Sequence, residues 1–317
     1  MKEQNNTMKE QKDYKIDYKK AVENIREQLK QYVKENKLKS LVLGVSGGID
    51  SCLCAALAKP VCDELNIPLI GRSLPILSNK QDEIDRAKRT GECFCTNFNV
   101  GVLSEIFNQF AIINPDPTET YISFIENQAL DNEKIKKDWK IRNGNIKARL
   151  RMIYLYNLAS MTNGMVLSTD NYTEYLLGFW TLHGDVADYA MIQNLWKTEV
   201  YDIAEWIARN ECKTLEESTI LLKTIDALAT DGLGVTDMGD LGQIMPDFKG
   251  TSRDGYKEVD QILKNYLLLK NEAAMTPKVI TVIDKIINHP VIQRHNATHF
   301  KRNNPVNILR SDIFKIN

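Results

Sequence analysis

The chain contains 317 residues, of which 43% are apolar and 26% charged, proportions that are typical of a globular enzyme. Its 41 Lys and Arg residues and 42 Asp and Glu residues give a net charge of −1, which excludes binding of nucleic acid through a broad basic surface. The apolar runs fall far short of the ~20 residues of a membrane span, and the charged N-terminus lacks a secretory signal, so we expect a cytoplasmic protein without membrane contacts.

Strand and helix patterns alternate along the first half of the chain. The polar residues 1–16 offer little apolar surface and are expected to be disordered, whereas 17–317 are expected to form one domain. The predicted elements are a helix from Asp17, a strand at Leu41–Val45, a helix at Ser51–Leu65, a strand at Ile67–Leu74, a helix from Asp82, a strand at Phe98–Leu103, a helix at Ile146–Met161 and a strand at Met165–Leu167. This alternation predicts an α/β fold, a doubly wound Rossmann-like parallel sheet flanked by helices.

From about Tyr201 the spacing of apolar residues is mostly helical. Helices are predicted over residues 201–209, 254–269 and 276–288. The tail from Phe300 is rich in Lys and Asn and is expected to be irregular. The chain therefore combines an α/β sheet with a mostly helical C-terminal part.

A glycine-rich loop with the sequence Ser-Gly-Gly-Ile-Asp-Ser follows the first predicted strand. Gly47 and Gly48 lack Cβ atoms, so the backbone there can approach a ligand closely or adopt a positive φ. The backbone N–H groups and the positive end of the following helix attract an anion, and the hydroxyls of Ser46 and Ser51 add donors. Asp50 offers a hard oxygen ligand for Mg²⁺. The loop is therefore predicted to bind phosphate, although it is neither an ordinary ATPase loop nor a dinucleotide fingerprint.

This loop resembles the pyrophosphate loop of the ATP pyrophosphatases, which cleave ATP to AMP and pyrophosphate. That group includes NAD, GMP, asparagine and argininosuccinate synthetases and tRNA-modifying enzymes, and the loop alone does not choose among them. The resemblance implies that ATP is bound here by Gly44, Val45, Ser46, Gly47, Gly48, Ile49, Asp50 and Ser51.

A second pair of motifs is specific to one member of the group. The segments 145–152 and 168–174 are similar to the NAD synthetase pattern of a K-A-R-x-R-M helix followed by T-D-x-x-x-E. Arg149 and Arg151 are two residues apart and so point in different directions from a helix; the resemblance places Arg149 on the substrate. It also implies that Thr169, at the end of a buried strand, binds ATP, and that Glu174 joins Asp50 as a ligand of Mg²⁺.

The next block, residues 178–198, resembles the family's G-F-x-T-K-x-G-D-G-G-A-D…L-x-K segment. The match implies that Lys197 binds ATP. Leu182 stands where many members carry lysine, and the stretch after Gly184 is one residue shorter, so that placing Asp188 on the family's substrate aspartate requires a gap.

Two later blocks also resemble the family. Residues 230–242 are similar to a loop that places Thr230 on ATP, with Thr224 as a weaker competitor. Residues 298–305 are similar to a T-x-H-K-R…P tail, in which Lys301 matches the substrate lysine and Phe300 replaces the histidine. The implied site for deamido-NAD thus contains Arg149, Leu182, Asp188, Phe300 and Lys301.

The resemblance covers residues from about 20 to 305 and implies a single NAD synthetase catalytic domain. In that family ATP, deamido-NAD and ammonia give NAD, AMP and pyrophosphate through an adenylate intermediate, with Mg²⁺ and without a protein nucleophile. It also implies a homodimer with the deamido-NAD site at the subunit interface. The loop strand begins near Leu41, too early for an upstream amidase domain, so we expect free ammonia as the nitrogen donor.

Two other interpretations remain open at this point. An ATP pyrophosphatase that acts on tRNA would favour a basic tract or paired catalytic cysteines, but the six cysteines show only C-x-C spacing and are interpreted as reduced, buried thiols. A degenerate, non-catalytic nucleotide-binding homologue is the second alternative, because the departures from the pattern all fall on the substrate side. AMP release that depends on both deamido-NAD and ammonia would distinguish these interpretations.

Overall fold

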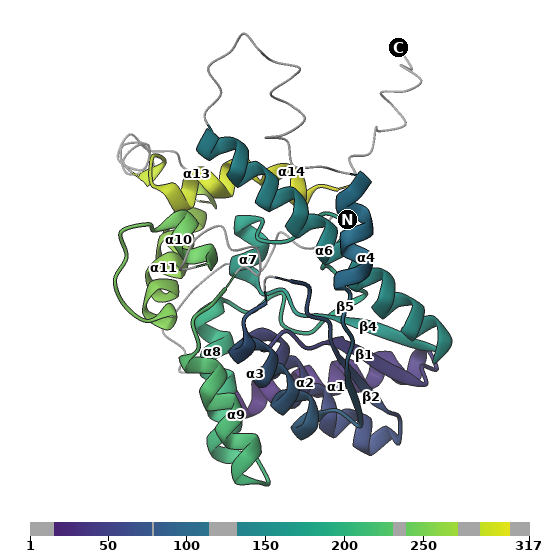
Figure 1. The fold of residues 1–317 in the computed structure, drawn as a ribbon. Helices are drawn as coiled ribbons and strands as arrows, with labels where there is room; N and C mark the ends of the chain where they lie inside the picture. The colour runs from purple at the N-terminus through teal and green to yellow at the C-terminus, as the bar shows by residue number, and fades with distance from the viewer. Residues whose placement is uncertain (1–15, 78, 114–131, 231–238, 272–285, 305–317) are drawn as a thin grey trace, which may run out of the picture.

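The computed structural model describes residues 16–77, 79–113, 132–230, 239–271 and 286–304, which form a parallel sheet with helices on both faces (Figure 1). The strand order in the sheet is β3-β2-β1-β4-β5, and every neighbouring pair is parallel. The strands are β1 (Ser40–Gly44), β2 (Leu69–Ser73), β3 (Asn97–Val100), β4 (Gly164–Ser168) and β5 (Tyr189–Ala190). The predicted doubly wound α/β fold is therefore confirmed.

The strand order reverses at β1. Val42 in β1 is in register with Ile70 of β2 on one side and with Val166 of β4 on the other. The chain thus runs outward from β1 through β2 to β3, and then returns to β4 on the opposite side of β1. Open α/β sheets form a ligand crevice at such a switch point, outside the carboxyl ends of the strands. The phosphate loop after β1 and Thr169 after β4 lie at this edge.

The helices of the described residues cover the sheet and make up most of the C-terminal part. They are α1 (Tyr18–Glu35), α2 (Ile49–Leu65), α3 (Gln81–Phe94), α4 (Ser104–Ile113), α6 (Asn132–Met161), α7 (Tyr172–Leu177), α8 (Lys197–Asn210), α9 (Leu215–Asp226), α10 (Gly239–Ile244), α11 (Ser252–Asn271), α13 (Pro290–Ala297) and α14 (His299–Arg302).

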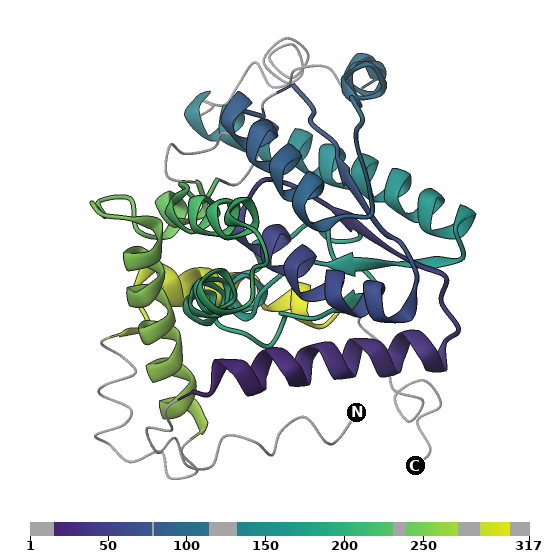
Figure 2. The same ribbon diagram turned by 90° about the horizontal axis from the view of Figure 1, so that it is seen from below.

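The two faces of the sheet pack against different helices because successive side chains of a strand point in opposite directions. Leu41 and Leu43 are fully buried in the larger core with α1, α2 and α8. Val42 and Val166 point the other way and pack with α6 and α4 in a second apolar cluster. Figure 2 shows α1 and α6 on opposite sides of the sheet. Burial on both faces explains why β1 and β4 appear in the sequence as unbroken apolar runs.

Two expectations require correction. The helix that the sequence predicts over Ile146–Met161 begins at Asn132. The prediction missed its first turns because they are rich in charged residues and carry no apolar stripe that marks a helix. The tail from Phe300 was expected to be irregular, and this is wrong for Phe300–Arg302, which lie in the helical turn α14. Arg302 holds this turn in place by donating to the carbonyl of Leu176 in α7.

Other expectations are confirmed or lie beyond the described ranges. Most strand and helix ends differ from the sequence prediction by a few residues, and residues 1–15 and most of the predicted helix 276–288 lie outside the described residues. Cys52 and Cys54 are buried and free, and burial raises the pKa of Cys52 to about 12, as expected for packed, unreactive thiols. None of the described helices is both long and apolar enough to cross a membrane.

Candidate active site

The phosphate loop forms a tight turn between β1 and α2. Gly47 has a φ of +88°, a conformation that favours glycine. A Cβ atom at Gly47 would lie 2.2 Å from the carbonyl oxygen of Glu83, at the start of α3. Only glycine therefore fits here, and the loop backbone passes directly beside α3.

Side-chain hydroxyls stabilise the loop from within. The backbone N–H of Ser46 donates to Ser51 Oγ (3.2 Å), and Ser51 Oγ donates to the carbonyl of Gly48 (3.1 Å). The N–H of Gly48, the N-cap residue of α2, donates to Ser46 Oγ (3.2 Å). These bonds fold the loop around the N-terminus of α2, whose dipole favours an anion.

A cavity of about 310 Å³ opens at the switch point of the sheet. Its volume is in the range of small-molecule sites. Among the residues that the sequence predicted for ATP and metal, the lining contains Gly44, Val45, Ser46, Gly48, Ile49, Asp50, Thr169, Glu174, Lys197 and Thr230. The structure thus brings together, around one cavity, residues that are up to 186 positions apart in the chain (44 to 230).

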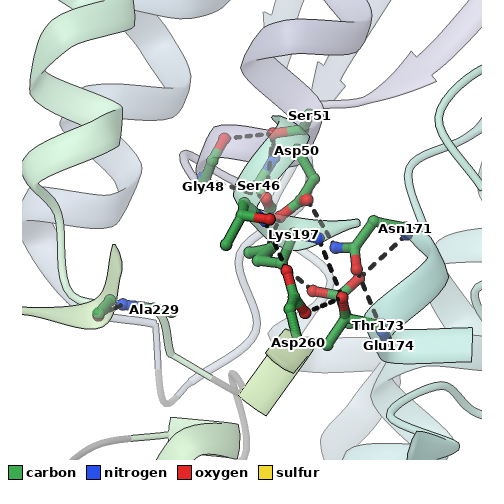
Figure 3. A network of polar contacts seen from close by, with 12 residues as sticks. Ser46, Gly48, Asp50, Ser51, Asn171, Thr173, Glu174, Lys197, Ala229 and Asp260 are labelled. Carbon is green, nitrogen blue, oxygen red and sulfur yellow. Dashed lines mark hydrogen bonds and ion pairs between the residues drawn. The ribbon is translucent and has the colours of Figure 1, made fainter. Parts of the chain in front are cut away.

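Lys197 joins the two carboxylates that were predicted to bind metal. Its Nζ atom lies 2.5 Å from Asp50 Oδ2 and 2.9 Å from Glu174 Oε1 (Figure 3). The side chain is only 3% exposed, so all three charges meet away from bulk water. Asn171 completes the cluster: its Nδ2 donates to Asp50 Oδ1 (2.9 Å), and its Oδ1 accepts from the N–H of Glu174 (3.0 Å).

The charges in this cluster depend on one another. Burial alone would favour a neutral amine, but the neighbouring Asp50 and Glu174 raise the pKa of Lys197 well above its ordinary value. Burial and the charge of Asp50 raise the pKa of Glu174, and Lys197 opposes that shift. Because each charge depends on the others, we describe the cluster as a lysine ammonium held between two carboxylates.

The residues present fit a divalent cation. Asp50 and Glu174 supply hard carboxylate oxygens that already converge on one positively charged atom, Lys197 Nζ. Within the described ranges, no group of three or more His, Cys, Asp or Glu side chains could enclose a metal. A pair of carboxylates that leaves the remaining positions to phosphate oxygens and water is the type of site that Mg²⁺ commonly uses.

The two threonine candidates differ in position. Thr230 is exposed at the mouth of the cavity, and its Oγ1 donates to Glu83 Oε1 (2.5 Å). Thr224 also lines the cavity, but it is buried, and its hydroxyl donates to the carbonyl of Leu221 in its own helix (2.7 Å). Thr230 is therefore the better placed of the two to meet a ligand.

Three of the residues predicted for deamido-NAD gather around the segment 178–185. Arg149 donates through Nε and Nη2 to the carbonyl of Leu182 (3.2 and 3.1 Å) and is exposed. Lys301 Nζ donates to the carbonyls of Gly178 (2.7 Å) and Trp180. The two cations therefore flank one loop, although 152 residues separate them in the sequence (149 to 301).

None of the five residues predicted for deamido-NAD lines the cavity at the phosphate loop, and the other two have different surroundings. Asp188 accepts from the N–H of Val166 in β4 (3.2 Å) and from the Tyr156 hydroxyl (2.7 Å). These bonds hold its side chain beside β4, and Asp188 does not line the cavity. Phe300 is 57% exposed on α14. The gapped alignment pointed to Asp188 as the substrate aspartate, but the acidic residue that lines the cavity here is Asp185. Burial raises the pKa of Asp185 to about 6.

Several cavity residues were not predicted from the sequence. Arg151, to which the resemblance gave no substrate contact, lines the cavity and donates to the carbonyl of Leu74 (2.9 Å) and to Asn79 Oδ1 (3.1 Å). Asn171, which bonds Asp50 but does not line the cavity, lies inside the T-D-x-x-x-E motif, so its position within that motif was an available signal. Arg72, which also lines the cavity, shows no local pattern that would have marked it.

Comparison with known proteins identifies the family. A family model described as NAD synthase matches residues 21–305. The chain belongs to the NAD synthase family. It is 30% identical over 275 residues to an NH(3)-dependent NAD(+) synthetase of Pyrococcus furiosus, an alignment that covers 86% of this chain and 90% of that protein. It is also 34% identical over 245 residues to an NH(3)-dependent NAD(+) synthetase of Mycoplasma genitalium, covering 76% and 81% of the two chains.

Solved structures show the same fold. An NMN synthetase from Francisella tularensis superposes with a TM-score of 0.64 at 22% identity, over 92% of this chain and 99% of the other. An NH3-dependent NAD synthetase from Campylobacter jejuni gives 0.60 at 23% identity, over 93% and 100%. At these identities the likeness establishes that this NAD synthase family member shares their fold.

Proposed function

We propose that this NAD synthase family member condenses deamido-NAD with ammonia, using ATP, to give NAD, AMP and pyrophosphate. The observation that carries the proposal is the convergence of Asp50, Glu174 and Lys197 beside the phosphate loop, at the switch point of the sheet. The relatives named NH(3)-dependent NAD(+) synthetases support ammonia as the nitrogen donor.

The chemistry requires that two substrates be positioned and that charge on the leaving pyrophosphate be neutralised. The nicotinate carboxylate attacks the α-phosphorus of ATP, pyrophosphate departs, and ammonia then displaces AMP from the adenylate. The N–H groups of the phosphate loop and the N-terminus of α2 would bind the phosphates. Mg²⁺ held by Asp50 and Glu174 would supply positive charge at the pyrophosphate. Lys197, Thr169 and Thr230 would contact ATP, and no protein nucleophile is needed.

The substrate side of the proposal rests on the cations around residues 178–185. Arg149 and Lys301 would bind the negative charges of deamido-NAD. Both cations lie beside this segment, where they donate to its backbone carbonyls in the absence of substrate. Leu182 and Phe300 would add apolar contacts in place of the cationic side chains found in other members of the family. Asp188 would have to leave its bonds to Val166 and Tyr156 to reach the substrate, so Asp185 is the better-placed acidic residue.

A homodimer is part of the proposal. Ile153 and Met161 of α6 and Ile106 and Phe110 of the adjacent α4 are large apolar side chains that are 45–74% exposed. An exposed apolar face of this kind is typical of a protein interface. Arg149 lies one helical turn before Ile153, so an interface on this face would place the predicted substrate cation at its border.

The decisive experiment follows AMP release and NAD formation by the purified chain. We expect both products only when ATP, deamido-NAD and ammonia are all present, with glutamine a poor substitute for ammonia. AMP formation that does not require deamido-NAD would contradict the proposed substrate. Absence of turnover despite binding of ATP would instead favour a degenerate nucleotide-binding homologue. Efficient NAD formation from glutamine without ammonia would refute the proposed nitrogen donor.

A further inference from the structure

A buried carboxylate outside the cavity connects the two helices that carry the reactive cluster. Asp260 lies on α11 and is 1% exposed, and it is not among the residues that line the cavity. Its Oδ1 accepts from the Thr173 hydroxyl at 2.6 Å, and its Oδ2 accepts from the N–H of Thr198 at 2.9 Å. Within the described ranges, no Lys or Arg forms an ion pair with Asp260. A carboxylate buried without a paired cation is unfavourable unless hydrogen bonds stabilise it. These two bonds, with the Thr198 hydroxyl and the charge of Lys264, oppose the rise in the pKa of Asp260 that burial causes.

One of these bonds caps α8 from another helix. The N-cap residue of α8 is Trp196, whose side chain makes no capping hydrogen bond. The first-turn N–H of Thr198 would lack the side-chain acceptor that Ser, Thr, Asp or Asn supplies at this position. Asp260 of α11 provides that acceptor, and its negative charge also suits the positive end of the α8 dipole. The cap therefore fixes the start of α8, where Lys197 lies, against α11.

The other bond reaches the helix that carries Glu174. Thr173 is fully buried in α7, a helix of six residues that is too short to be rigid by itself. Its hydroxyl donates to Asp260 and accepts from the backbone N–H of Lys197 at 2.9 Å. The residues bonded to Asp260 are thus the immediate neighbours of Glu174 and Lys197, which form the 2.9 Å ion pair in the cavity (Figure 3).

We propose that Asp260 is a positioning residue for the reaction: through Thr173 and Thr198 it sets the distance between Glu174 and Lys197, and thereby the geometry of the charges that receive the phosphates of ATP. This inference rests on the proposed function. Asp260 contacts neither the phosphates nor the metal ligands directly, so it acts by aligning α7 with α8. A small displacement between these helices changes the positions of a carboxylate and an ammonium relative to the phosphate loop, and such misplacement reduces turnover strongly.

The test compares variants that break the link with one that only weakens the core. Asp260→Asn keeps the side-chain shape but turns one acceptor into a donor, and Thr173→Val removes only the linking hydroxyl. Val259→Ala is the matched control, because Val259 is the fully buried neighbour of Asp260 on α11 and takes no part in the link. Thr173→Ser retains the hydroxyl and serves as the rescue variant. Kinetic constants, melting temperatures and Mg²⁺-dependent binding of α,β-methylene ATP are measured for each.

We expect Asp260→Asn and Thr173→Val to lower kcat at least about tenfold, the scale of one lost charge-assisted hydrogen bond, with little change in KM for deamido-NAD. Thr173→Ser should keep a normal kcat. Val259→Ala should lower the melting temperature without that loss of kcat. The double variant Asp260→Asn/Thr173→Val should lose less kcat than the product of the two single effects, because both substitutions remove the bond between Thr173 and Asp260.

Wild-type kcat in both Asp260→Asn and Thr173→Val would overturn the inference, and so would an equal loss of kcat in Val259→Ala. If Asp260→Asn does not fold, the comparison of kcat between Thr173→Val and Thr173→Ser tests the inference. If the wild type makes no NAD, the proposed function fails separately. The positioning role is then judged from binding of α,β-methylene ATP, which Thr173→Val should weaken and Val259→Ala should not.

Discussion

The ammonium of Lys197 lies 2.5 Å from the carboxylate of Asp50, although the two residues are 147 positions apart. Lys197 therefore occupies the place between Asp50 and Glu174 where a divalent cation would be bound. On the proposed function, binding of Mg²⁺ and ATP would move the ammonium from the carboxylates toward the phosphates. The same lysine would then neutralise the two carboxylates without ligand and the phosphates with it.

Replacing Lys197 should increase the stabilisation of the protein by Mg²⁺. In Lys197→Met, Asp50 and Glu174 lose their common cation, and two buried carboxylates without a partner are strongly unfavourable. We expect Mg²⁺ without nucleotide to raise the melting temperature of the variant more than that of the wild type, and NAD formation to fall at least about tenfold. Lys264→Met, which removes a lysine beside Trp196 outside the cluster, is the control. An equal effect of Mg²⁺ on variant and wild type would refute the competition.

The charge of Glu174 should matter more than its shape. Glu174→Gln keeps the length of the side chain but removes the charge that Lys197 and a hard cation prefer. Turnover should fall at least about tenfold, and more Mg²⁺ should be needed for half-maximal rate. Glu217→Gln is a matched control, because Glu217 occupies the same capping position at the start of α9 as Glu174 does in α7, away from the cluster. Unchanged rates across a Mg²⁺ titration of Glu174→Gln would contradict the metal assignment.

Lys301 should act on one substrate only. Its Nζ donates to carbonyls of the segment 178–185, beside the predicted deamido-NAD site, and it does not line the cavity at the phosphate loop. Lys301→Ala should therefore raise KM for deamido-NAD about tenfold or more and leave KM for ATP nearly unchanged. The exposed Lys257→Ala should change neither constant. Normal deamido-NAD kinetics in Lys301→Ala would remove this residue from the site.

Oligomeric state should depend on the apolar face of α6. Ile153→Asp places a charge in the centre of that face, and sedimentation should show a monomer where the wild type is a dimer, because burying an unpaired charge is unfavourable. Leu215→Asp is the control, since Leu215 is 85% exposed at the start of α9, away from this face. A monomeric wild type at assay concentration, or a dimeric Ile153→Asp, would defeat the proposed interface.

The pH dependence of stability should report His295. Its Nδ1 lies 2.9 Å from the carbonyl of Leu176, and burial, with the nearby charge of Arg302, lowers its pKa from 6.5 to about 4. A histidine whose pKa is lower in the folded than in the unfolded state stabilises the fold fully above pH 6.5 and loses that contribution as the pH falls to about 4. The melting temperature should drop across this window in the wild type and less steeply in His295→Gln. Parallel curves for the two proteins would show that His295 has no part in the loss.

The sequence by itself determined the features that depend on neighbouring residues. The phosphate loop is a local pattern: the positive φ of Gly47 favours glycine, and an apolar run precedes it and a helix follows it in the sequence. The alternation of such strands with helices was enough to predict the doubly wound sheet. The motif around Thr169 and Glu174 likewise predicted which residues lie at the cavity.

Only the tertiary structure decided how distant residues meet. Lys197 pairs with Asp50 because the strand order places β1 beside β4, and no spacing within the sequence encodes that distance. Asp260 carries no local signal at all, since one aspartate on an amphipathic helix is ordinarily exposed, and its burial depends on the packing of α11 against α7 and α8. Local interactions select strands, helices and turns, whereas the pairing of charges across the site depends on which elements the fold brings together.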